Sequence, residues 1–319
     1  KTPNGTSSGL NNALTATGRP RHPLTDTPGT DLEARMVSLP EGRVALVWQA
    51  FTGGNFEILL RVFDGETWGA PQNVSTHAAS DWRPALCADS RGDIAIVWDS
   101  YRYGSYDVLM RILSEGSLSP TRAISVTPAY EANATAVWDQ KGRLWVAWEE
   151  GTEGWGKDQG AVVPKPKPVT GLYARRVTRL AVVEGDRLLK PKADVTQMPG
   201  VELRQFVENP RLCVGREGTI YLAFRTVHQQ VRLHPWGHGR FRTDRAWETY
   251  VSALSGKAWT RPLGIPHHYG RIGSSPVPVA LPEGGLCVIQ HSDERSYEDI
   301  RRMTQNTILA ADIPAVAGD

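Results

Sequence analysis

Short hydrophobic runs, each ended by Gly, Asp or Pro, recur along most of the chain. Some alternate apolar and polar residues, as in "RPALCAD", and others are apolar almost throughout, as in "DIAIVWDS". Both patterns are typical of β-strands, because successive side chains of a strand point to opposite faces of a sheet. The pattern therefore predicts an all-β protein of short strands joined by tight turns.

A unit of 50 residues repeats in the first half of the chain. Two residue types mark it at equal intervals: Gly42, Gly92 and Gly142, and Trp48, Trp98 and Trp148. Each unit holds four candidate strands, which in the second unit read "RPALCAD", "DIAIVWDS", "YDVLMRI" and "TRAISVT". Four antiparallel strands at this period predict one blade of a β-propeller.

Two further units follow at longer spacings. Gly218 and Gly284 each open an equivalent second strand, 76 and 66 residues after the preceding marker glycine. The additional residues fall mainly in two insertions, Gly151–Thr170 and His228–Ala246, between the second and third strands. Neither insertion shows strand periodicity, so we expect both to be long loops. The sequence thus predicts five four-stranded blades.

The two ends of the chain predict how the ring closes. Residues 23–31 align, at an offset of 50, with the fourth strands of later units, and no blade precedes them. The final segment, residues 306–319, has a third strand and no fourth. We therefore expect the N-terminal segment to complete the last blade, which removes the open sheet edges. The expected parts are a polar tail or linker at 1–19 and a propeller at 20–319, with blades near 31–79, 80–129, 130–199, 200–270 and 271–319 plus 20–30.

Composition narrows the function classes only slightly. Hydrophobic residues make up 40% and charged residues 22%, and the net charge of +2 does not indicate a nucleic-acid or membrane-surface partner. No apolar run approaches the roughly 18 residues of a membrane span. The three cysteines form no CxxC pair, so we expect buried, inert thiols and no zinc site. The chain begins at Lys1 without a signal peptide, which suggests a processed or trimmed chain.

The candidate functional residues follow from propeller geometry. The start of each first strand and the end of each second strand lie on one face, so their side chains surround one mouth of the central channel. We expect the Trp to pack between blades and the residue after it to face this mouth. These positions hold Gln49, Asp99, Glu149, Arg225 and His291 on second strands, and Glu33, Arg83, Asn133, Asn209 and Ser275 on first strands.

Asp99 and Glu149 are equivalent residues of neighbouring blades and the leading candidates for catalysis. Two carboxyl groups facing one cavity can divide into a proton donor and an ionised base or nucleophile, as in glycosidases. His291 is the candidate to orient them or relay protons. A structural role stays open for all three, because such acids also cap turns or pair with arginines, and a lone His is often a satisfied polar residue.

The remaining mouth residues are candidates for substrate binding. Arg83 and Arg225 suit a carboxylate or phosphate ligand, although balancing nearby acids is an equal alternative. Aromatic and histidine residues of the insertions and of a later linker could contact a sugar or remain in solvated loops. The expected binding set is Gln49, Glu33, Arg83, Asn133, Asn209, Arg225, Trp155, Trp236 and His268, and no residue is predicted to bind a metal.

Two resemblances support the propeller prediction. The stretch "FDGETWGAP", Phe63–Pro71, resembles the Asp-box turn of sialidases with one residue missing; that turn is a folding element remote from the active site. The stretch "RPALCADSRGDIAIVWDSYRYGSYDVLMR" resembles propeller repeats of large secreted bacterial proteins, both TolB-like repeats and those preceding a PHP-type metallophosphoesterase domain. The five blades also resemble arabinanase and fructosidase propellers, whose acids lie on first strands.

These observations lead to one function and two alternatives. We expect a secreted, periplasmic or cell-surface bacterial propeller that cleaves a glycan, acidic or branched, by hydrolysis or elimination. The alternatives are a non-catalytic propeller that binds glycan or protein within a larger polypeptide, and a propeller with a structural calcium at its axis. The expected partner is a glycan or other small anionic ligand, with no nucleic acid, no membrane span and no other cofactor; further domains could be fused or docked.

Overall fold

The computed structural model describes residues 23–25, 27–153, 175–199, 207–233, 241–265, 275–292 and 307–314, with the backbone alone given for 227–233, 241–246, 292 and 307–309. Within these ranges the helices are two short 3-10 turns, η1 (Pro40–Gly42) and η2 (Val195–Gln197). No helix of the described chain has the length and apolar content needed to cross a membrane.

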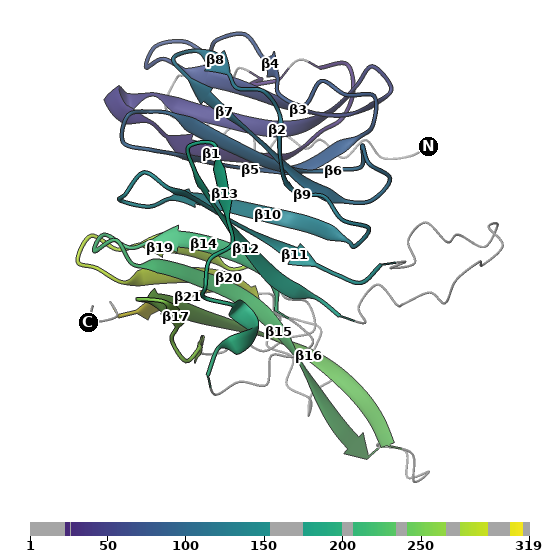
Figure 1. Ribbon diagram of the computed structural model, residues 1–319, viewed down its shortest axis with the longest axis vertical. Helices are drawn as coiled ribbons and strands as arrows, with labels where there is room; N and C mark the ends of the chain where they lie inside the picture. Colours follow the sequence, from purple (N-terminus) through teal and green to yellow (C-terminus); the bar gives the residue numbers. More distant parts are fainter. Residues whose placement is uncertain are drawn as a thin grey trace, which may run out of the picture.

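Five antiparallel sheets contain the described strands, so the all-β prediction is confirmed (Figure 1). The first three sheets are β1 (Asp31–Ser38), β2 (Val44–Thr52), β3 (Asn55–Phe63) and β4 (Gln72–Asn73); β5 (Asp81–Ala88), β6 (Ile94–Ser100), β7 (Asp107–Ser114), β8 (Ser117–Leu118) and β9 (Arg122–Ser125); and β10 (Glu131–Trp138), β11 (Leu144–Glu150), β12 (Val177–Glu184) and β13 (Arg187–Leu189). The last two are β14 (Glu208–Val214), β15 (Ile220–Leu233), β16 (Phe241–Ser255), β17 (Ala258–Trp259) and β18 (Leu263–Gly264); and β19 (Val277–Ala280), β20 (Leu286–Ser292) and β21 (Thr307–Ile313).

The repeated glycine has a backbone reason. It lies in the turn between the first and second strands of each sheet and has a positive φ in all five: Gly42 72°, Gly92 93°, Gly142 72°, Gly218 87° and Gly284 100°. Residues with a Cβ adopt this left-handed conformation at a cost, and glycine does not. The marker that defined the repeat is therefore a turn requirement of each sheet.

Buried clusters join successive sheets. One cluster combines Val47 of the first sheet with Trp98 of the second, and another combines Val97 of the second with Trp148 of the third. Trp98 is 0% exposed. Trp98 and Trp148 therefore pack between sheets, as the sequence predicted, whereas Trp48 lies in a cluster of first-sheet residues.

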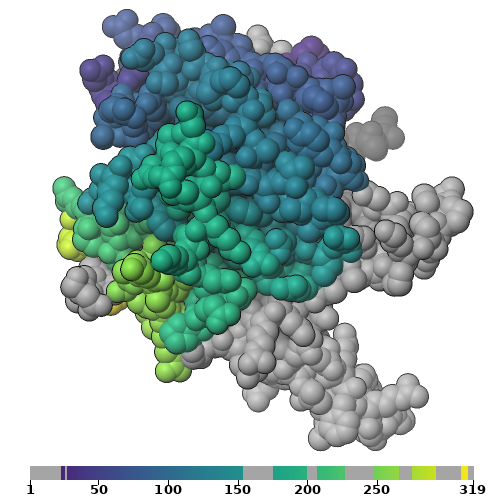
Figure 2. Space-filling view, in the orientation of Figure 1, coloured from purple at the N-terminus to yellow at the C-terminus, as the bar shows by residue number. Residues whose placement is uncertain are grey.

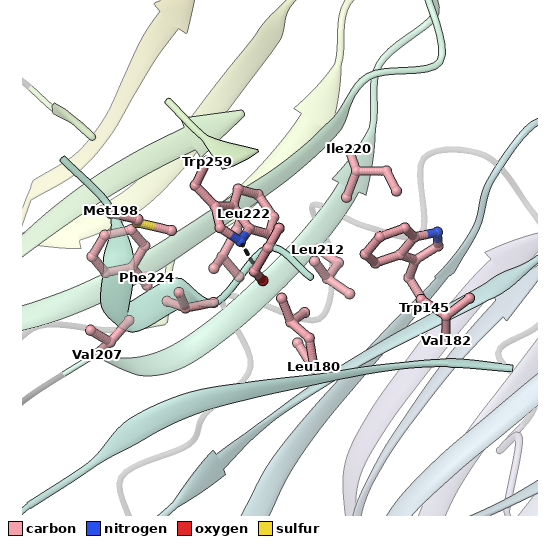
Figure 3. Packing of buried hydrophobic residues seen from close by; sticks show 13 residues of the cluster. Trp145, Leu180, Val182, Met198, Val207, Leu212, Ile220, Leu222, Phe224 and Trp259 are labelled. Atoms are coloured by element: carbon pink, nitrogen blue, oxygen red, sulfur yellow. Dashed lines mark hydrogen bonds between the residues drawn. The ribbon is translucent and has the colours of Figure 1, made fainter. Parts of the chain in front are cut away.

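Figure 3 shows the corresponding core between the third and fourth sheets, where Trp145 and Leu180 meet Leu212 and Phe224. Trp259 adds a hydrogen bond across this core, from its Nε1 to the carbonyl oxygen of Ala193 at 3.2 Å. In the space-filling view the purple and blue N-terminal residues lie at the top, and the yellow residues lie beside green ones lower down (Figure 2).

The prediction for the second insertion is wrong. Instead of a loop over His228–Ala246, β15 continues to Leu233 and β16 begins at Phe241, with unbroken pairing along both strands. Figure 1 shows this ribbon projecting beyond the fourth sheet. Main-chain hydrogen bonds hold such a ribbon, and where no core faces it the sequence needs no apolar alternation. The first insertion lies mostly outside the described residues.

The Asp-box-like turn occurs where the sequence placed it, between β3 and β4. Asp64 Oδ1 accepts hydrogen bonds from the main-chain nitrogens of Glu66 at 2.8 Å and Thr67 at 2.7 Å. These two amides are the main causes that lower the pKa of Asp64. The rings of Phe63 and Trp68 pack against each other at the base of the turn.

The cysteine prediction is only partly right. Cys87 is buried, whereas Cys213 and Cys287 are half-buried, and none of the three forms a disulfide. Burial raises the pKa of Cys213 to about 11, so its thiol stays protonated and unreactive at neutral pH.

Replacing Gly142 by Ala tests the turn requirement. A Cβ at Gly142 would meet no atom within 4 Å, so the cost comes from the left-handed backbone alone. We expect the free energy of unfolding, measured by urea denaturation, to fall by about 1–2 kcal/mol. Gly69→Ala is the control, because Gly69 is not among the positive-φ glycines and a Cβ there makes an ordinary 3.4 Å contact. Equal effects of the two substitutions would contradict this explanation.

Candidate functional site

One cavity of about 780 Å³ is lined by residues of the first strand of every sheet, or directly before it. Seven of the ten residues predicted for the channel mouth line it: Glu33, Arg83, Asn133, Glu149, Asn209, Arg225 and Ser275. The structure thus brings most of the predicted binding set together, and the roles of these residues stay predictions.

The other predicted residues lie elsewhere. Gln49 and Asp99 are buried at 5% and 0% exposure and do not line the cavity. His291 is half-buried at the end of β20 and is also outside the lining. Trp155, Trp236 and His268 lie outside the described residues.

Each of the first four sheets has a bulge at the start of its first strand. The bulge residue has a positive φ: Glu33 54°, Arg83 48°, Asn133 57° and Asn209 51°. At the same point the pairing with the second strand shifts register. Asn tolerates the left-handed conformation better than Glu or Arg, so a bulge residue such as Arg83 needs an external contact to hold it.

That contact comes from the neighbouring sheet. The side chain that follows the second-strand aromatic residue accepts a hydrogen bond from the main-chain nitrogen of the next sheet's bulge residue, and we name this contact the inter-sheet latch. The three latches join Arg83 N to Gln49 Oε1 at 2.9 Å, Asn133 N to Asp99 Oδ2 at 3.1 Å and Asn209 N to Glu149 Oε1 at 2.5 Å. The repeat can therefore change this side chain as long as it remains an acceptor.

The latch explains the position of Asp99. Burial raises its pKa to about 7, while the charge of Arg83 and the amide of Asn133 act in the opposite direction. A group fully enclosed in this way cannot touch a ligand in the cavity. The geometry thus favours the structural alternative for Asp99, and a catalytic role for it stays untested.

Glu149 differs from Asp99 because it both latches and lines the cavity. Its Oε2 lies 3.9 Å from Nε of Arg176, and the guanidinium of Arg176 stacks over the ring of Tyr130 at 4.2 Å. Gly151 makes this arrangement possible, since a Cβ there would lie 2.3 Å from Nη1 of Arg176. The result is a charged aromatic wall of the cavity built from three sequence-distant residues.

The fourth sheet replaces the latch pattern by an ion pair. Arg225 bonds to Glu208, the residue directly opposite it on β14, and the side-chain oxygen of Asn209 accepts from its Nε at 3.1 Å and its Nη2 at 2.8 Å. Burial and the negative charge of Glu149 raise the pKa of Glu208 to about 7, with Arg225 opposing them. Trp247 covers the guanidinium of Arg225, with its ring centroid 4.7 Å away.

Positive charge predominates in the cavity. Its ionisable lining, apart from Tyr130, comprises five arginines and three glutamates: Arg35, Arg83, Arg176, Arg211 and Arg225, and Glu33, Glu149 and Glu208. Glu208 titrates near neutrality, which reduces the negative charge further below pH 7. The cavity is therefore suited to an anionic ligand, and arginine binds carboxylates and other oxyanions with two parallel bonds.

Five ionisable lining residues were not among the predicted site residues: Arg35, Tyr130, Arg176, Glu208 and Arg211. Two of them carried a signal, because they break the repeat. Tyr130 stands where the earlier units have Thr30 and Ser80. Glu208 and Arg225 lie opposite each other on neighbouring strands, and they replace a pair that in the earlier units consists of an apolar residue and a hydrogen-bond acceptor. Arg176 follows the irregular first insertion, so no spacing rule could place it.

Comparison with solved structures supports the fold. A protein of unknown function from Dyadobacter fermentans superposes with a TM-score of 0.55 at 12% identity, covering 91% of this chain and 80% of that one. A PL25 ulvan lyase bound to -[GlcA(1-4)Rha3S]- superposes with a TM-score of 0.51 at 11% identity, and the match covers 89% of this chain and 64% of the lyase. These identities show a shared fold and no more.

An endo-arabinase from Bacteroides thetaiotaomicron is also similar, at 14% identity over 90% of this chain and 95% of that one. Its TM-score of 0.45 is too low to carry an argument. No protein-family model and no curated protein matches the sequence. The TolB-like and PHP-associated resemblances therefore stay predictions.

The raised pKa of Asp99 predicts a pH dependence of stability. The folded protein retains a proton on Asp99 up to about pH 7, whereas the unfolded chain releases it near pH 4. Stability therefore falls as the pH rises through this window, by at most about 1.4 kcal/mol per pH unit for this group. Asp99→Asn cannot ionise and keeps an oxygen for Asn133, so we expect a weaker fall in chemical denaturation across the window.

Asp64→Asn is the control for this experiment. The pKa of Asp64 is lowered by the turn amides, so this group loses its contribution only as the pH falls through acidic values below the window. It should leave the decline between about pH 4 and about pH 7 unchanged. An Asp99→Asn protein with the full wild-type decline would show that Asp99 is ionised in the folded state.

Proposed function

We propose that the chain is a five-bladed propeller that binds an acidic glycan in its central cavity and cleaves a glycosidic bond there. The observation that carries this proposal is the excess of arginines on a cavity lined by all five sheets. A secreted, periplasmic or cell-surface bacterial location, where such glycans are encountered, goes with the proposal.

The contacts of two equivalent arginines support ring closure by the N-terminal segment. Arg111 of the second sheet donates from Nη1 to the carbonyl oxygen of Val74, which belongs to the end of the preceding unit, at 2.9 Å. Arg61 of the first sheet donates from Nη1 to the carbonyl oxygen of Leu24 at 2.5 Å. Because Leu24 and Val74 are 50 residues apart, Leu24 takes the place of a fourth strand that precedes the first sheet.

Removal of residues 1–30 tests this closure. In the proposed ring the segment completes the fifth blade, whose described residues form three strands, and its loss would leave an open edge at the joint with the first sheet. We expect the melting temperature to fall by more than about 4 °C, which corresponds to a loss of at least 1–2 kcal/mol in a domain of this size. Thermal unfolding by circular dichroism checks this, and an unchanged melting temperature contradicts the closure.

Arg83, Arg176 and Arg225 are the proposed anion-binding groups. Arg83 donates from Nη1 to the side-chain oxygen of Asn133 at 2.9 Å, which orients its guanidinium along the cavity wall. Arg225 is oriented by Glu208 and covered by Trp247, and Arg176 by Tyr130. Such pre-oriented guanidinium groups bind the carboxylate of a uronic acid or a sulfate ester with little loss of side-chain freedom.

Glu208 is the proposed acid and Glu149 the proposed base. A carboxyl group with a pKa of about 7 is substantially protonated at neutral pH and can donate its proton to the departing glycosidic oxygen. In hydrolysis the carboxylate of Glu149 would take a proton from the attacking water; in elimination it would take the proton beside the uronate carboxyl group. Glu208 replaces Asp99 in this proposal because Asp99 does not reach the cavity, and His291 has no assigned step.

A second function, glycan binding without turnover, is favoured by one observation. Both proposed catalytic glutamates already have partners: Glu149 accepts from Asn209 and lies near Arg176, and Glu208 is paired with Arg225. Carboxyl groups used to hold the walls of the cavity together would leave a recognition module. The experiment must therefore separate binding from cleavage.

Turnover on uronate-containing and sulfated polysaccharides is the decisive measurement, with reducing-end and unsaturated-product assays run in parallel. We expect Glu208→Gln and Glu149→Gln each to lower kcat by about 10²-fold or more, while Glu66→Gln, on the exposed turn after β3, leaves it unchanged. Activity of the wild type should fall as the pH rises above about 7, because Glu208 then loses its proton. Unsaturated products would identify elimination, and saturated products hydrolysis.

Binding of the same polysaccharides decides between the two functions. Binding without turnover, weakened about tenfold or more by Arg83→Ala, would leave the recognition module. Neither binding nor turnover on any acidic glycan would contradict both functions and the anionic character of the ligand.

A further inference from the structure

The joint between the first and second sheets contains two buried carboxyl groups and a cation. Glu57 is 6% exposed and bonds to Ser75, and Asp81 is 0% exposed. The guanidinium of Arg102 lies in the same joint, with Nη2 at 3.5 Å from Asp81 Oδ1. Burying two carboxylates is costly, and here an arginine that is itself only 10% exposed balances them.

Among the described residues, the joint between the second and third sheets repeats the acids without the cation. Asp107 and Glu131 take the places of Glu57 and Asp81, at an offset of 50 residues, and both are 0% exposed. Thr152 stands where the earlier joint has Arg102. Among the described residues, no ion pair involves either Asp107 or Glu131.

A third acid increases the negative charge of this joint. Glu150 stands where the earlier joint has Ser100, and it is engaged by Arg179, whose Nη2 lies 2.7 Å from its Oε1. Arg179 thus pairs with Glu150, which is partly exposed, and not with the two enclosed carboxyl groups of Asp107 and Glu131.

The oxygens of Asp107 and Glu131 converge on one loop. Ser105 Oγ donates to Thr127 O at 2.9 Å and lies 3.2 Å from Asp107 Oδ1. The main-chain nitrogen of Thr127 donates to Glu131 Oε2 at 3.2 Å, and Ser125 Oγ donates to Oε1 at 2.5 Å. The carboxyl groups therefore meet around Thr127, and Asp107 Oδ2 is buried there with no hydrogen-bond partner among the described residues.

The tryptophans show that Glu131 is turned toward this point. Trp98 Nε1 donates to Asp81 Oδ1 at 2.9 Å, as Trp48 does to Asp31 in the first sheet. In the third sheet the equivalent nitrogen, Nε1 of Trp148, has no partner among the described residues, because Glu131 is bonded to Ser125 and Thr127 instead. Among the described residues this joint thus lacks the buried hydrogen bond from Trp to the acid, and the Glu131 carboxyl group is held at Thr127, to which Asp107 is linked through Ser105.

We propose that this joint binds a calcium ion between Asp107 and Glu131, at the place that Arg102 neutralises in the preceding joint. All the donors are oxygens: the two carboxyl groups, the Thr127 carbonyl and the Ser105 hydroxyl, which suits calcium with its irregular shell of six to eight oxygens. The described residues contain no group of three or more His, Cys, Asp or Glu side chains arranged for a metal, so neutral oxygens and water complete the shell.

The site is separate from the cavity. Neither Asp107 nor Glu131 is among the cavity-lining residues, so this is not an ion at the propeller axis. The proposal does not depend on what the cavity binds.

Calcium-dependent stability tests the proposal. Chelator-treated full-length protein is unfolded thermally with calcium, with magnesium and with neither. We expect millimolar calcium to raise the melting temperature of the wild type by about 4 °C or more. Asp107→Asn and Glu131→Gln should abolish the rise, whereas Glu57→Gln, the matched change in the arginine-containing joint, should retain it.

Terbium luminescence gives a second readout on the wild type, because it needs no variant to fold. Terbium bound at this joint lies near Tyr106, whose carbonyl oxygen accepts from the main-chain nitrogen of Glu131, and calcium should displace it. No calcium-dependent rise in the wild type, or an equal rise in Asp107→Asn, would overturn the proposal. A rise with magnesium alone would overturn the assignment to calcium.

Discussion

The structure depends on one hydrogen bond repeated at successive joints, the inter-sheet latch. Each latch holds the left-handed bulge residue of one first strand by a side chain of the sheet before it, so the two sheets fix each other's geometry. The bulge in turn breaks the pairing register at the start of the first strand and sets how side chains such as Arg83 and Asn209 enter the cavity. The cavity wall is thus determined by contacts between sheets and not within them.

The chemistry arises where the repeat departs from this pattern. In the first two latches the acceptor is enclosed, but in the third Glu149 also reaches the cavity beside Arg176. In the fourth sheet the acceptor is replaced by Arg225, which turns back to Glu208 and Asn209 of its own sheet. The ionisable pair of Glu208 and Arg225 therefore occurs in the fourth sheet, where the residue at the latch position, Arg225, cannot accept a hydrogen bond.

Much of the fold could be predicted from the sequence because the repeat reports local requirements. The glycines at 42 and 92 mark left-handed turns, and the Trp marks the packing between sheets. The positive φ of Arg83 could not be predicted, because its cause is Gln49, 34 residues away and in another sheet. The extension of β15 and β16 was missed for a different reason, since a ribbon beyond the core has no apolar pattern to read.

The candidate site was harder to predict than the fold. Position in the repeat placed seven of ten candidates at the cavity, but it did not show which side chains line the cavity and which are enclosed against a neighbouring sheet. Asp99 and Glu149 are equivalent in sequence, yet Asp99 is enclosed whereas Glu149 lines the cavity beside Arg176. Such a difference depends on how distant residues pack around the side chain, and the spacing of the repeat carries no information on that packing.

The latch has a consequence for how such a protein can diversify. A joint needs one hydrogen-bond acceptor of suitable length, and Gln49, Asp99 and Glu149 each supply it. Exchanges among amides and acids at this position can therefore preserve the latch, although enclosing the acid raises its pKa, as at Asp99. The position that joins two sheets is thus also one at which the sequence can introduce or remove an ionisable group.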